Sequence, residues 1–175
     1  MIKLEKFTEI DFERLINWIE TEEILVQFSG PIFKFPLTKE QLNDYSNSEK
    51  IIPFKIVNIE NNEIIGHSEI YRTENNEVKL CRILIGDENQ RGNGIGKKIV
   101  NELLKYSYKE LNAEKIELNV YDWNKSAIVC YEKTGFEINQ NKFSEIDVKG
   151  NKWISLNMVL NKSKWEKIIN IDNKK

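Results

Sequence analysis

Residues 83–97 read ILIGDENQRGNGIGK, in which an apolar strand passes through a polar turn into a helix. Glycines at positions 92, 94 and 96 lack the Cβ atoms that would keep a ligand away from the backbone. The free N–H groups of the first helical turn can therefore point at an anion, with the helix dipole behind them. We expect this turn to bind a phosphate or pyrophosphate, with Arg91 beside it.

Other glycine-rich turns fit this stretch less well. A dinucleotide-binding turn has the pattern G-x-G-x-x-G in the first strand–helix unit, whereas residues 92–96 give G-x-G-x-G after several predicted antiparallel strands. A Walker A loop has Ser or Thr after Gly-Lys, and here Lys98 follows. An ordinary tight turn needs one or two glycines, so three at alternate positions favour an anion site.

The rest of the chain predicts an α+β domain built on one mixed, mostly antiparallel sheet. Alternating apolar residues indicate strands, and apolar residues at helical spacing indicate helices. Asparagine-rich turns join three successive strands into a meander. We expect strands at 2–7, 53–59, 63–72, 78–86, 116–121 and 152–160, with extended chain from 136 onward. We expect helices at 8–19, 38–47, 94–111 and 124–134.

No internal repeat and no Pro-, Gly- or Ser-rich linker divides the chain, which predicts a single domain over residues 1–160. Residues 161–175 form a tail that contains Trp165. This tail is expected either to dock as a terminal helix or to bind a partner. The last strand and the tail offer an edge and an apolar face, which favours a homodimer.

Composition argues against several classes of function. The 175 residues include 26 Lys and Arg against 28 Asp and Glu, a net charge of -2, without a block of like charges. Neither a nucleic acid nor a membrane is therefore expected as a partner. Cys81 and Cys130 lie far apart and near no histidine, which predicts neither a metal site nor a disulfide. Together with the lack of a signal-peptide-like start, they indicate a cytoplasmic protein.

A second motif follows the glycine turn. The pattern Asn124-x-x-Ala127-x-x-x-Tyr131-x-x-x-Gly135-Phe136 reads as a helix closed by glycine. Combined with Arg91-x-x-Gly94-x-Gly96, in this order, it resembles the GNAT family of acyl-CoA-dependent N-acetyltransferases. The resemblance spans residues 2–160 and looks most similar to the branch of ribosomal-protein alanine and polyamine acetyltransferases.

The resemblance implies acetyl-CoA as cosubstrate, no metal, and a sheet of about six to seven strands. It also implies helices on both faces and a splayed central strand pair, whose gap takes the pantetheine arm. A bulge within residues 83–86 would open this gap, and Gly86 suits such a bulge. Backbone N–H groups there would bind the thioester carbonyl and its oxyanion. The expected cofactor-binding residues are Ile83, Leu84, Ile85, Arg91, Gly92, Asn93, Gly94, Ile95, Gly96, Lys97, Asn124, Ala127 and Tyr131.

Tyr131 matches the general acid of that family. A phenol with a pKa of about 10 stays protonated at neutral pH and can donate its proton to the leaving thiolate. Asn124 stands at the expected start of the same helix. Its side chain is expected either to cap the helix or to tie it to the pantetheine amide or to ordered water.

Three residues are candidates for the general base. Glu69 is the first and His67 the second, because both share strand parity with Tyr71 and can face the acceptor. Asp122, at the end of the strand before Asn124, is the third. Removal of the proton through water is a further alternative. Neither cysteine has a paired base, so direct transfer is expected in place of a covalent acyl-enzyme.

Acceptor specificity is expected from residues 18–36 and from the hairpin before the last strand. Phe28, Phe33 and Phe35 would line an apolar slot or form a core patch. Glu22 and Glu23 would attract a cationic amine or form a solvated helix face. The chain is thus expected to acetylate a primary amine of a small molecule, polyamine or protein N-terminus. A non-catalytic acetyl-CoA-binding module is the alternative.

Overall fold

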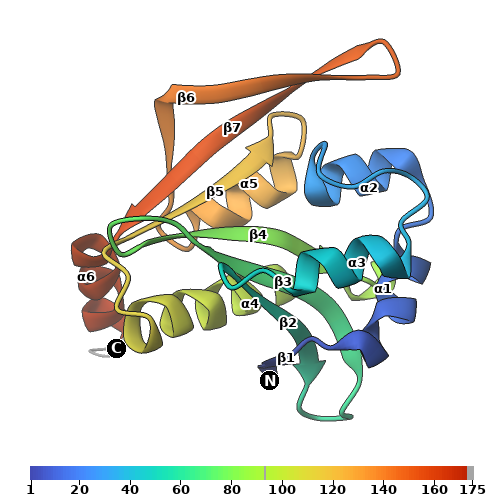
Figure 1. Ribbon diagram of the computed structural model, residues 1–175. Coiled ribbons are helices and arrows are strands. Elements are labelled where there is room, and N and C mark those ends of the chain that lie inside the picture. Colours follow the sequence, from blue (N-terminus) through green and yellow to red (C-terminus); the bar gives the residue numbers. More distant parts are fainter. Residues whose placement is uncertain (93, 173–175) are drawn as a thin grey trace.

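The computed structural model describes residues 1–92 and 94–172, apart from the side chains of Asn89 and Asp172. It is built on one seven-stranded sheet with the strand order β1-β2-β3-β4-β5-β7-β6. Among these strands β4 and β5 run parallel, and the other neighbours are antiparallel (Figure 1). The strands are β1 (Ile2–Lys6), β2 (Ile51–Asn58), β3 (Ile64–Arg72), β4 (Glu77–Ile85), β5 (Lys115–Tyr121), β6 (Glu137–Val148) and β7 (Asn151–Asn161).

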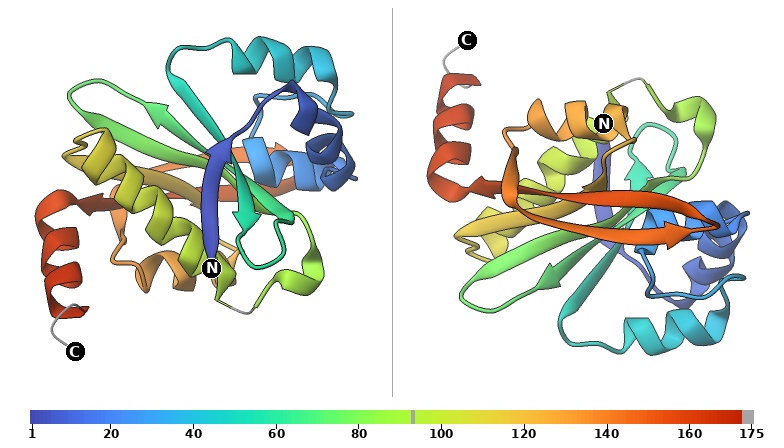
Figure 2. Two further views of the ribbon diagram at one scale, coloured as in Figure 1. Left: turned by 90° about the horizontal axis from the view of Figure 1, so that it is seen from below. Right: turned by 90° about the horizontal axis from the view of Figure 1, so that it is seen from above.

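Helices cover both faces of the sheet, as expected. They are η1 (Glu9–Asp11), α1 (Phe12–Trp18), α2 (Glu22–Ser29), α3 (Lys39–Ser46), η2 (Glu88–Gln90), α4 (Ile95–Lys105), η3 (Tyr106–Glu110), α5 (Lys125–Glu132) and α6 (Lys162–Asp172). The first three α-helices enclose one core with Phe7, and α4, α5 and α6 enclose the other. Figure 2 shows α4 across the sheet from below and the β6–β7 hairpin across it from above.

The expected meander is β2, β3 and β4, and β1 extends it at the edge. Two predicted helices differ in detail. The segment predicted as one helix over 8–19 begins with the 3-10 turn η1, where Thr8 and Asp11 form a capping box. The helix predicted over 94–111 ends as α4 at Lys105 and continues as a π-helix, η3, in which the Leu111 N–H donates to the Tyr106 carbonyl.

The expected splay lies between β4 and β5. Their parallel pairing ends at Leu80 and Leu118, yet β4 continues to Ile85 and β5 to Tyr121. The bulge begins one residue before the predicted range 83–86. From Cys81 to Leu84 β4 takes three steps where β3 takes two, and Arg82 between them has a φ of 50°. The bulge therefore centres on Arg82 and overlaps the predicted range only at Ile83.

Gly86 is required for a different reason. A Cβ atom at this position would lie 2.0 Å from the Trp18 ring, so the indole packs directly on the backbone. The glycine thus serves the contact between α1 and the end of β4.

The last strand is not an edge, contrary to the expectation on which the homodimer rested. β7 lies between β5 and β6, and the outer strands are β1 and β6. The apolar face of the tail is also occupied, since Trp165 of α6 is buried against Tyr108 with ring centroids 4.6 Å apart. The tail therefore docks on its own chain.

Candidate active site

The glycine turn leaves the start of α4 open. Gly92 and Gly94 have φ angles of 86° and 73°, which side-chain-bearing residues rarely adopt. No described atom lies within 4 Å of a Cβ built on either residue. Within the described part of the chain, no side-chain hydrogen bond caps α4, so its first N–H groups remain free for a ligand. Asn93 lies outside the described residues.

The other predicted residues of the turn have more than one role. A Cβ on Gly96 would lie 3.3 Å from Cys130 Sγ, so this glycine also lets α4 approach α5. Arg91 donates to the Ile85 carbonyl at 3.1 Å and to Glu88 Oε1 at 2.8 Å, and thereby ties the turn to the end of β4. Ile95 is half-buried against the core, and Lys97 is exposed.

A buried ion pair stands at the bulge. Arg82 Nη1 donates to Glu69 Oε2, and the two side chains are 6% and 0% exposed. The guanidinium also lies over two rings, 4.9 Å from the centroid of Tyr45 and 5.3 Å from that of Phe33. A left-handed conformation is costly for a residue with a side chain, and these contacts hold Arg82 in it.

The pair leaves polar atoms without partners. Glu69 Oε1 and Arg82 Nε are buried and have no hydrogen-bond partner among the described residues. Nearby, the Cys81 thiol has its pKa raised to about 12 by burial and by the Glu69 carboxylate. The end of β4 where the strands splay is thus poorly solvated, with hydrogen-bonding capacity that the fold leaves unused.

His67 is fully buried among aromatic rings. Its ring centroid lies 4.5 Å from that of Phe7 and 5.6 Å from that of Phe28, and its Nε2 is 3.5 Å from Tyr45 Oη. Burial, assisted by the Arg82 charge, lowers the pKa of His67 to about 3. The imidazole is therefore neutral at physiological pH.

Tyr131 lies on α5, close enough to Cys81 of β4 for that thiol to affect its pKa. Its ring contacts Phe136 edge-on at 6.2 Å, and it packs against the main core. Burial raises the pKa of the phenol well above its ordinary value, and the thiols of Cys130 and Cys81 raise it further. The hydroxyl is therefore protonated at neutral pH.

The remaining predicted residues lie at the start of α5 and at the end of β4. Asn124 Oδ1 accepts from the Ala127 N–H at 3.2 Å and from Ser126 Oγ at 3.1 Å, so of the two expectations for Asn124 the structure displays the cap. Asp122 is half-buried, and its N–H donates to the Ile154 carbonyl at 2.8 Å. Ile83 and Ile85 pack on one core and Leu84 on the other, which leaves backbone as the common surface of this segment.

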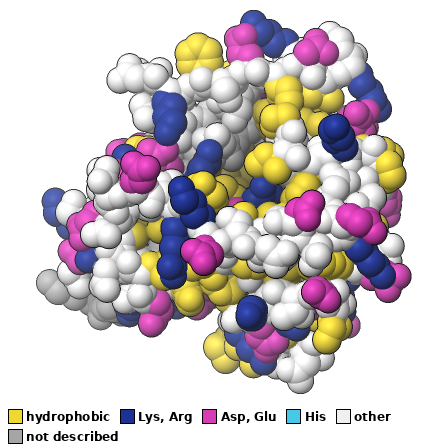
Figure 3. Space-filling model, viewed as in Figure 1, with side chains coloured by type: hydrophobic (Ala, Val, Ile, Leu, Met, Phe, Trp, Pro, Cys, Tyr) yellow, Lys and Arg dark blue, Asp and Glu magenta, His cyan; other side chains and the backbone are white. Residues whose placement is uncertain are grey.

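An open cavity of about 290 Å³ lies between α2, β7 and the segment that follows β5. We call it the aromatic cavity; it is lined by Glu23, Ile24, Gln27, Trp123 and Trp153. Figure 3 shows hydrophobic side chains gathered beneath the tip of the β6–β7 hairpin, bordered by charged ones. At this tip Lys149 Nζ lies 2.6 Å from Glu23 Oε1 and 3.7 Å from Glu22 Oε2.

The phenylalanines predicted to line an acceptor slot differ in their burial. Phe28 and Phe33 are buried in the core of α1–α3, and Phe35 is 45% exposed. The alternative of a core patch thus applies to the first two.

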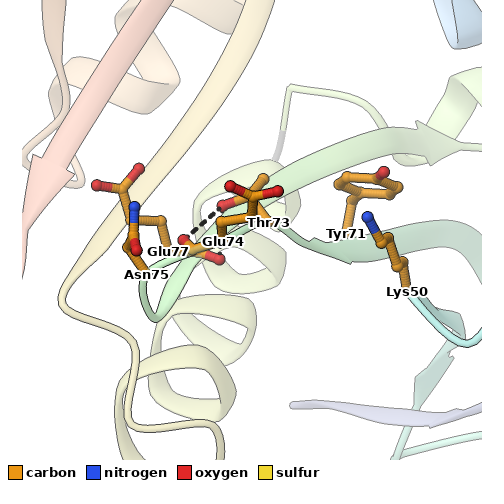
Figure 4. A pocket seen from close by; sticks show the side chains of 6 residues that line it. All are labelled: Lys50, Tyr71, Thr73, Glu74, Asn75 and Glu77. Carbon is orange, nitrogen blue, oxygen red and sulfur yellow. Dashed lines mark hydrogen bonds between the residues drawn. The ribbon is translucent and has the colours of Figure 1, made fainter.

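A cavity of about 350 Å³ lies elsewhere, at the β3–β4 turn. Figure 4 shows Lys50 and Tyr71 at one end and Thr73, Glu74, Asn75 and Glu77 along the turn. This turn joins the ends of β3 and β4 that are remote from the splay. The cavity is therefore not part of the candidate active site.

Five residues near the site were not predicted from the sequence: Tyr45, Arg82, Trp123, Lys149 and Trp153. A signal existed for Arg82, a charged residue inside the apolar run of β4. A weaker one existed for Lys149, which precedes Gly150 in a tight turn. No pattern in the sequence indicates that Trp123 and Trp153 lie close together, because their proximity depends on how the hairpin folds over β5.

The part of the chain that the structure describes contains no group of three or more His, Cys, Asp or Glu able to hold a metal ion. Over the same residues, no helix is long and apolar enough to cross a membrane.

Comparisons with known proteins agree with this geometry. The profile of the acetyltransferase (GNAT) family matches residues 13–136. An aminoglycoside N(6')-acetyltransferase type 1 of Klebsiella pneumoniae is 26% identical over an alignment of 150 positions that covers 78% of this chain and 74% of that protein. A spermine/spermidine N(1)-acetyltransferase of Bacillus subtilis is 33% identical over 79 residues, 45% of this chain and 49% of that protein.

Solved structures show the same fold. A spermidine N-acetyltransferase from Vibrio cholerae, in complex with CoA and spermine, superposes with a TM-score of 0.79 at 23% identity. The match covers 94% of this chain and 97% of the other. An aminoglycoside acetyltransferase in complex with coenzyme A gives a TM-score of 0.73 at 22% identity, covering 95% and 98%. The family profile spans most of the chain and the splay and glycine turn lie within it, so the chain belongs to the GNAT family of acetyltransferases.

Proposed function

We propose that the protein transfers the acetyl group of acetyl-CoA to a primary amine of a small polycationic molecule, by direct attack of the amine. The observation that carries this proposal is the splay of β4 and β5, with the open start of α4 on one side and Tyr131 on the other. The amines named for the relatives, spermine, spermidine and aminoglycosides, support a polycationic acceptor.

The described residues fit acetyl-CoA. The space before Gly92 and Gly94 admits a diphosphate to the N–H groups at the start of α4. The gap between β4 and β5 leaves the backbone of residues 83–85 without a strand partner on the β5 side, which suits an extended arm with amide groups. When bound, acetyl-CoA supplies the activated acetyl group.

The chain supplies the electrostatics of the reaction. Backbone N–H groups after the bulge are placed to stabilise negative charge on the acetyl oxygen, an effect worth a few kcal/mol in acyl transfer. Tyr131 holds a proton at Oη that it donates toward sulfur as the thiolate leaves. We assign Tyr131 the role of general acid on its place at the splay.

Glu69 is better suited to position the site than to act as its base. Its carboxylate is engaged by Arg82 and buried at the bulge. His67 faces aromatic rings and lies on the side of α1–α3. We therefore infer that water removes the amine proton, with Asp122 the remaining side-chain candidate.

Two further expectations accompany this function. The cytoplasm suits a protein with two free thiols, Cys81 and Cys130, and an acetyl-CoA substrate. A homodimer would use one of the outer strands, β1 or β6, because β7 and α6 are already paired within the chain.

The test is the rate of thiol release with spermidine as acceptor. Tyr131→Phe should lower kcat by about 10²-fold or more and leave the KM for acetyl-CoA nearly unchanged. Tyr108→Phe is the matched control, because it removes a buried hydroxyl that donates to the Leu160 carbonyl, far from the splay. Full turnover by Tyr131→Phe would refute the acid role.

The wild-type protein also tests the alternative function. A protein that acetyl-CoA stabilises against thermal unfolding, but that acetylates no amine, would be an acetyl-CoA-binding module.

A further inference from the structure

The aromatic cavity has the features of a site for an ammonium group. Tyr121 and Trp123 are stacked, with centroids 5.9 Å apart and planes 3° apart, and Trp153 stands edge-on to both at 5.0 and 4.9 Å. Trp123 is 42% exposed, so its ring is accessible to a ligand. Indole rings attract cations through their electron-rich faces more strongly than other side chains do.

One carboxylate lines the cavity and a second is its neighbour in sequence, and a lysine of the same chain forms ion pairs with both. Glu23 lines it and Glu22 precedes it at the start of α2. Lys149 reaches both from the hairpin tip, and its hydrogen bond lowers the pKa of Glu23. All three side chains are about half exposed, so water and other cations can compete for these contacts.

The backbone makes Lys149 an unusual choice. Lys149 and Gly150 have φ angles of 53° and 79° and form the two-residue turn between Val148 and Asn151. Such a turn strongly prefers Asn-Gly, because asparagine tolerates a positive φ better than lysine. A lysine here needs a reason outside the turn, and its ion pairs across to α2 supply one.

The cavity adjoins the active site. Tyr121 ends β5, one of the two splayed strands, and donates to the Val26 carbonyl of α2 at 3.4 Å. Trp123 comes directly before Asn124, which caps the helix that carries Tyr131. The volume of about 290 Å³ suits the end of a linear amine better than a whole drug-sized ligand.

We propose that the aromatic cavity binds a second ammonium group of a polycationic acceptor, and that Lys149 occupies its place until the acceptor displaces it. This inference rests on the proposed function. The acceptor's distal ammonium lies against Trp123 and Trp153 and exchanges with Lys149 Nζ at Glu23 and Glu22. A monocationic amine has no second ammonium group to place in this site. Lys149 therefore competes for Glu22 and Glu23 with polycationic acceptors alone.

The experiment compares spermidine with n-butylamine as acceptors for three variants. Trp153→Leu should raise the KM for spermidine by about 5-fold, and Glu23→Gln should raise it severalfold. Lys149→Asn should lower it, because the competitor is gone and the turn is kept. None of these changes should affect n-butylamine, and kcat should stay constant throughout.

The opposite response of Lys149→Asn distinguishes exchange from support of the hairpin. If Lys149 only held the hairpin in place, its removal would raise the KM, and it would do so for both amines. That result, or equal effects of Glu23→Gln on both amines, overturns the proposal. Glu23 is exposed, so its variant remains informative if Trp153→Leu fails to fold.

Calorimetric titration of spermidine into the CoA-bound protein separates the two proposals. If neither amine is acetylated, the proposed function fails, yet weaker spermidine binding by Glu23→Gln than by the wild type would still support the cavity. If both amines are acetylated but spermidine affinity is the same for the wild type, Glu23→Gln and Lys149→Asn, the function stands and the cavity proposal fails.

Discussion

Two ion pairs beside the α1–α3 region have the same chemistry and opposite surroundings. Glu69 and Arg82 are 0% and 6% exposed, whereas Glu23 and Lys149 are 45% and 55% exposed. The first pair fixes a strained backbone at the bulge, and its charges can be satisfied only by each other. The second joins two surface elements, and water can replace either partner. Burial thus decides which pair stabilises the fold and which can exchange its partner for a ligand.

The largest effect is expected from breaking the buried pair. Arg82→Met should lower the free energy of unfolding by about 3–5 kcal/mol, because it leaves the Glu69 carboxylate buried without a counter-charge. It should also weaken acetyl-CoA binding, since the bulge loses its anchor. Urea denaturation and calorimetric titration measure the two effects.

The double variant Arg82→Met/Glu69→Gln is the control for this prediction. Removing both charges should recover most of the lost stability, while acetyl-CoA binding stays weak because the bulge is still unanchored. A loss below about 1 kcal/mol for Arg82→Met would show that the pair is solvated like the exposed one.

His67 sharpens the comparison through pH. Its pKa is about 3 in the folded chain and 6.5 ordinarily, so below about pH 6.5 the unfolded chain binds a proton that the native chain does not. Stability therefore falls as the pH drops from about 6.5 toward 3. Between about pH 7.5 and about pH 5 the loss should be about 2 kcal/mol.

Urea denaturation of the wild type and of His67→Gln over this range isolates the effect. The variant lacks the titration and should show a smaller decrease, with the difference assigned to His67. The other titratable groups are the same in both proteins, so their contributions cancel. Parallel curves of the free energy of unfolding against pH would mean that His67 is hydrated in the folded protein, like a surface residue.

The sequence predicted the glycine turn and the start of α5 well and the surroundings of Glu69 poorly, for a physical reason. The glycine turn and the cap at Asn124 are local: their residues lie within a few positions of the groups they serve. The Glu69–Arg82 pair joins residues 13 positions apart on neighbouring strands, and the bulge shifts their register. No pattern along the chain reveals that shift.

The misplaced bulge shows the same limit. The bulge is predicted near Gly86 because glycine readily takes the conformations that bulges use. In the structure, however, this glycine lets the Trp18 ring pack on the backbone. The bulge instead centres on Arg82, whose strained φ is sustained by Glu69 of β3, Tyr45 of α3 and Phe33 of the loop before α3. Conformational preference identifies where a bulge is easy, and tertiary contacts decide where it forms.

The smallest effect is expected at the exposed pair. Lys149→Asn should leave the midpoint of thermal unfolding unchanged or slightly raised, because exposed ion pairs contribute little and Asn-Gly suits the turn. Lys149→Val removes the same ammonium but places a β-branched residue at a φ of 53°, so its midpoint should fall. If Lys149→Asn falls as far as Lys149→Val, the ammonium holds the hairpin to α2 and is not free to yield its place. The exposed pair would then stabilise the fold, as the buried pair does.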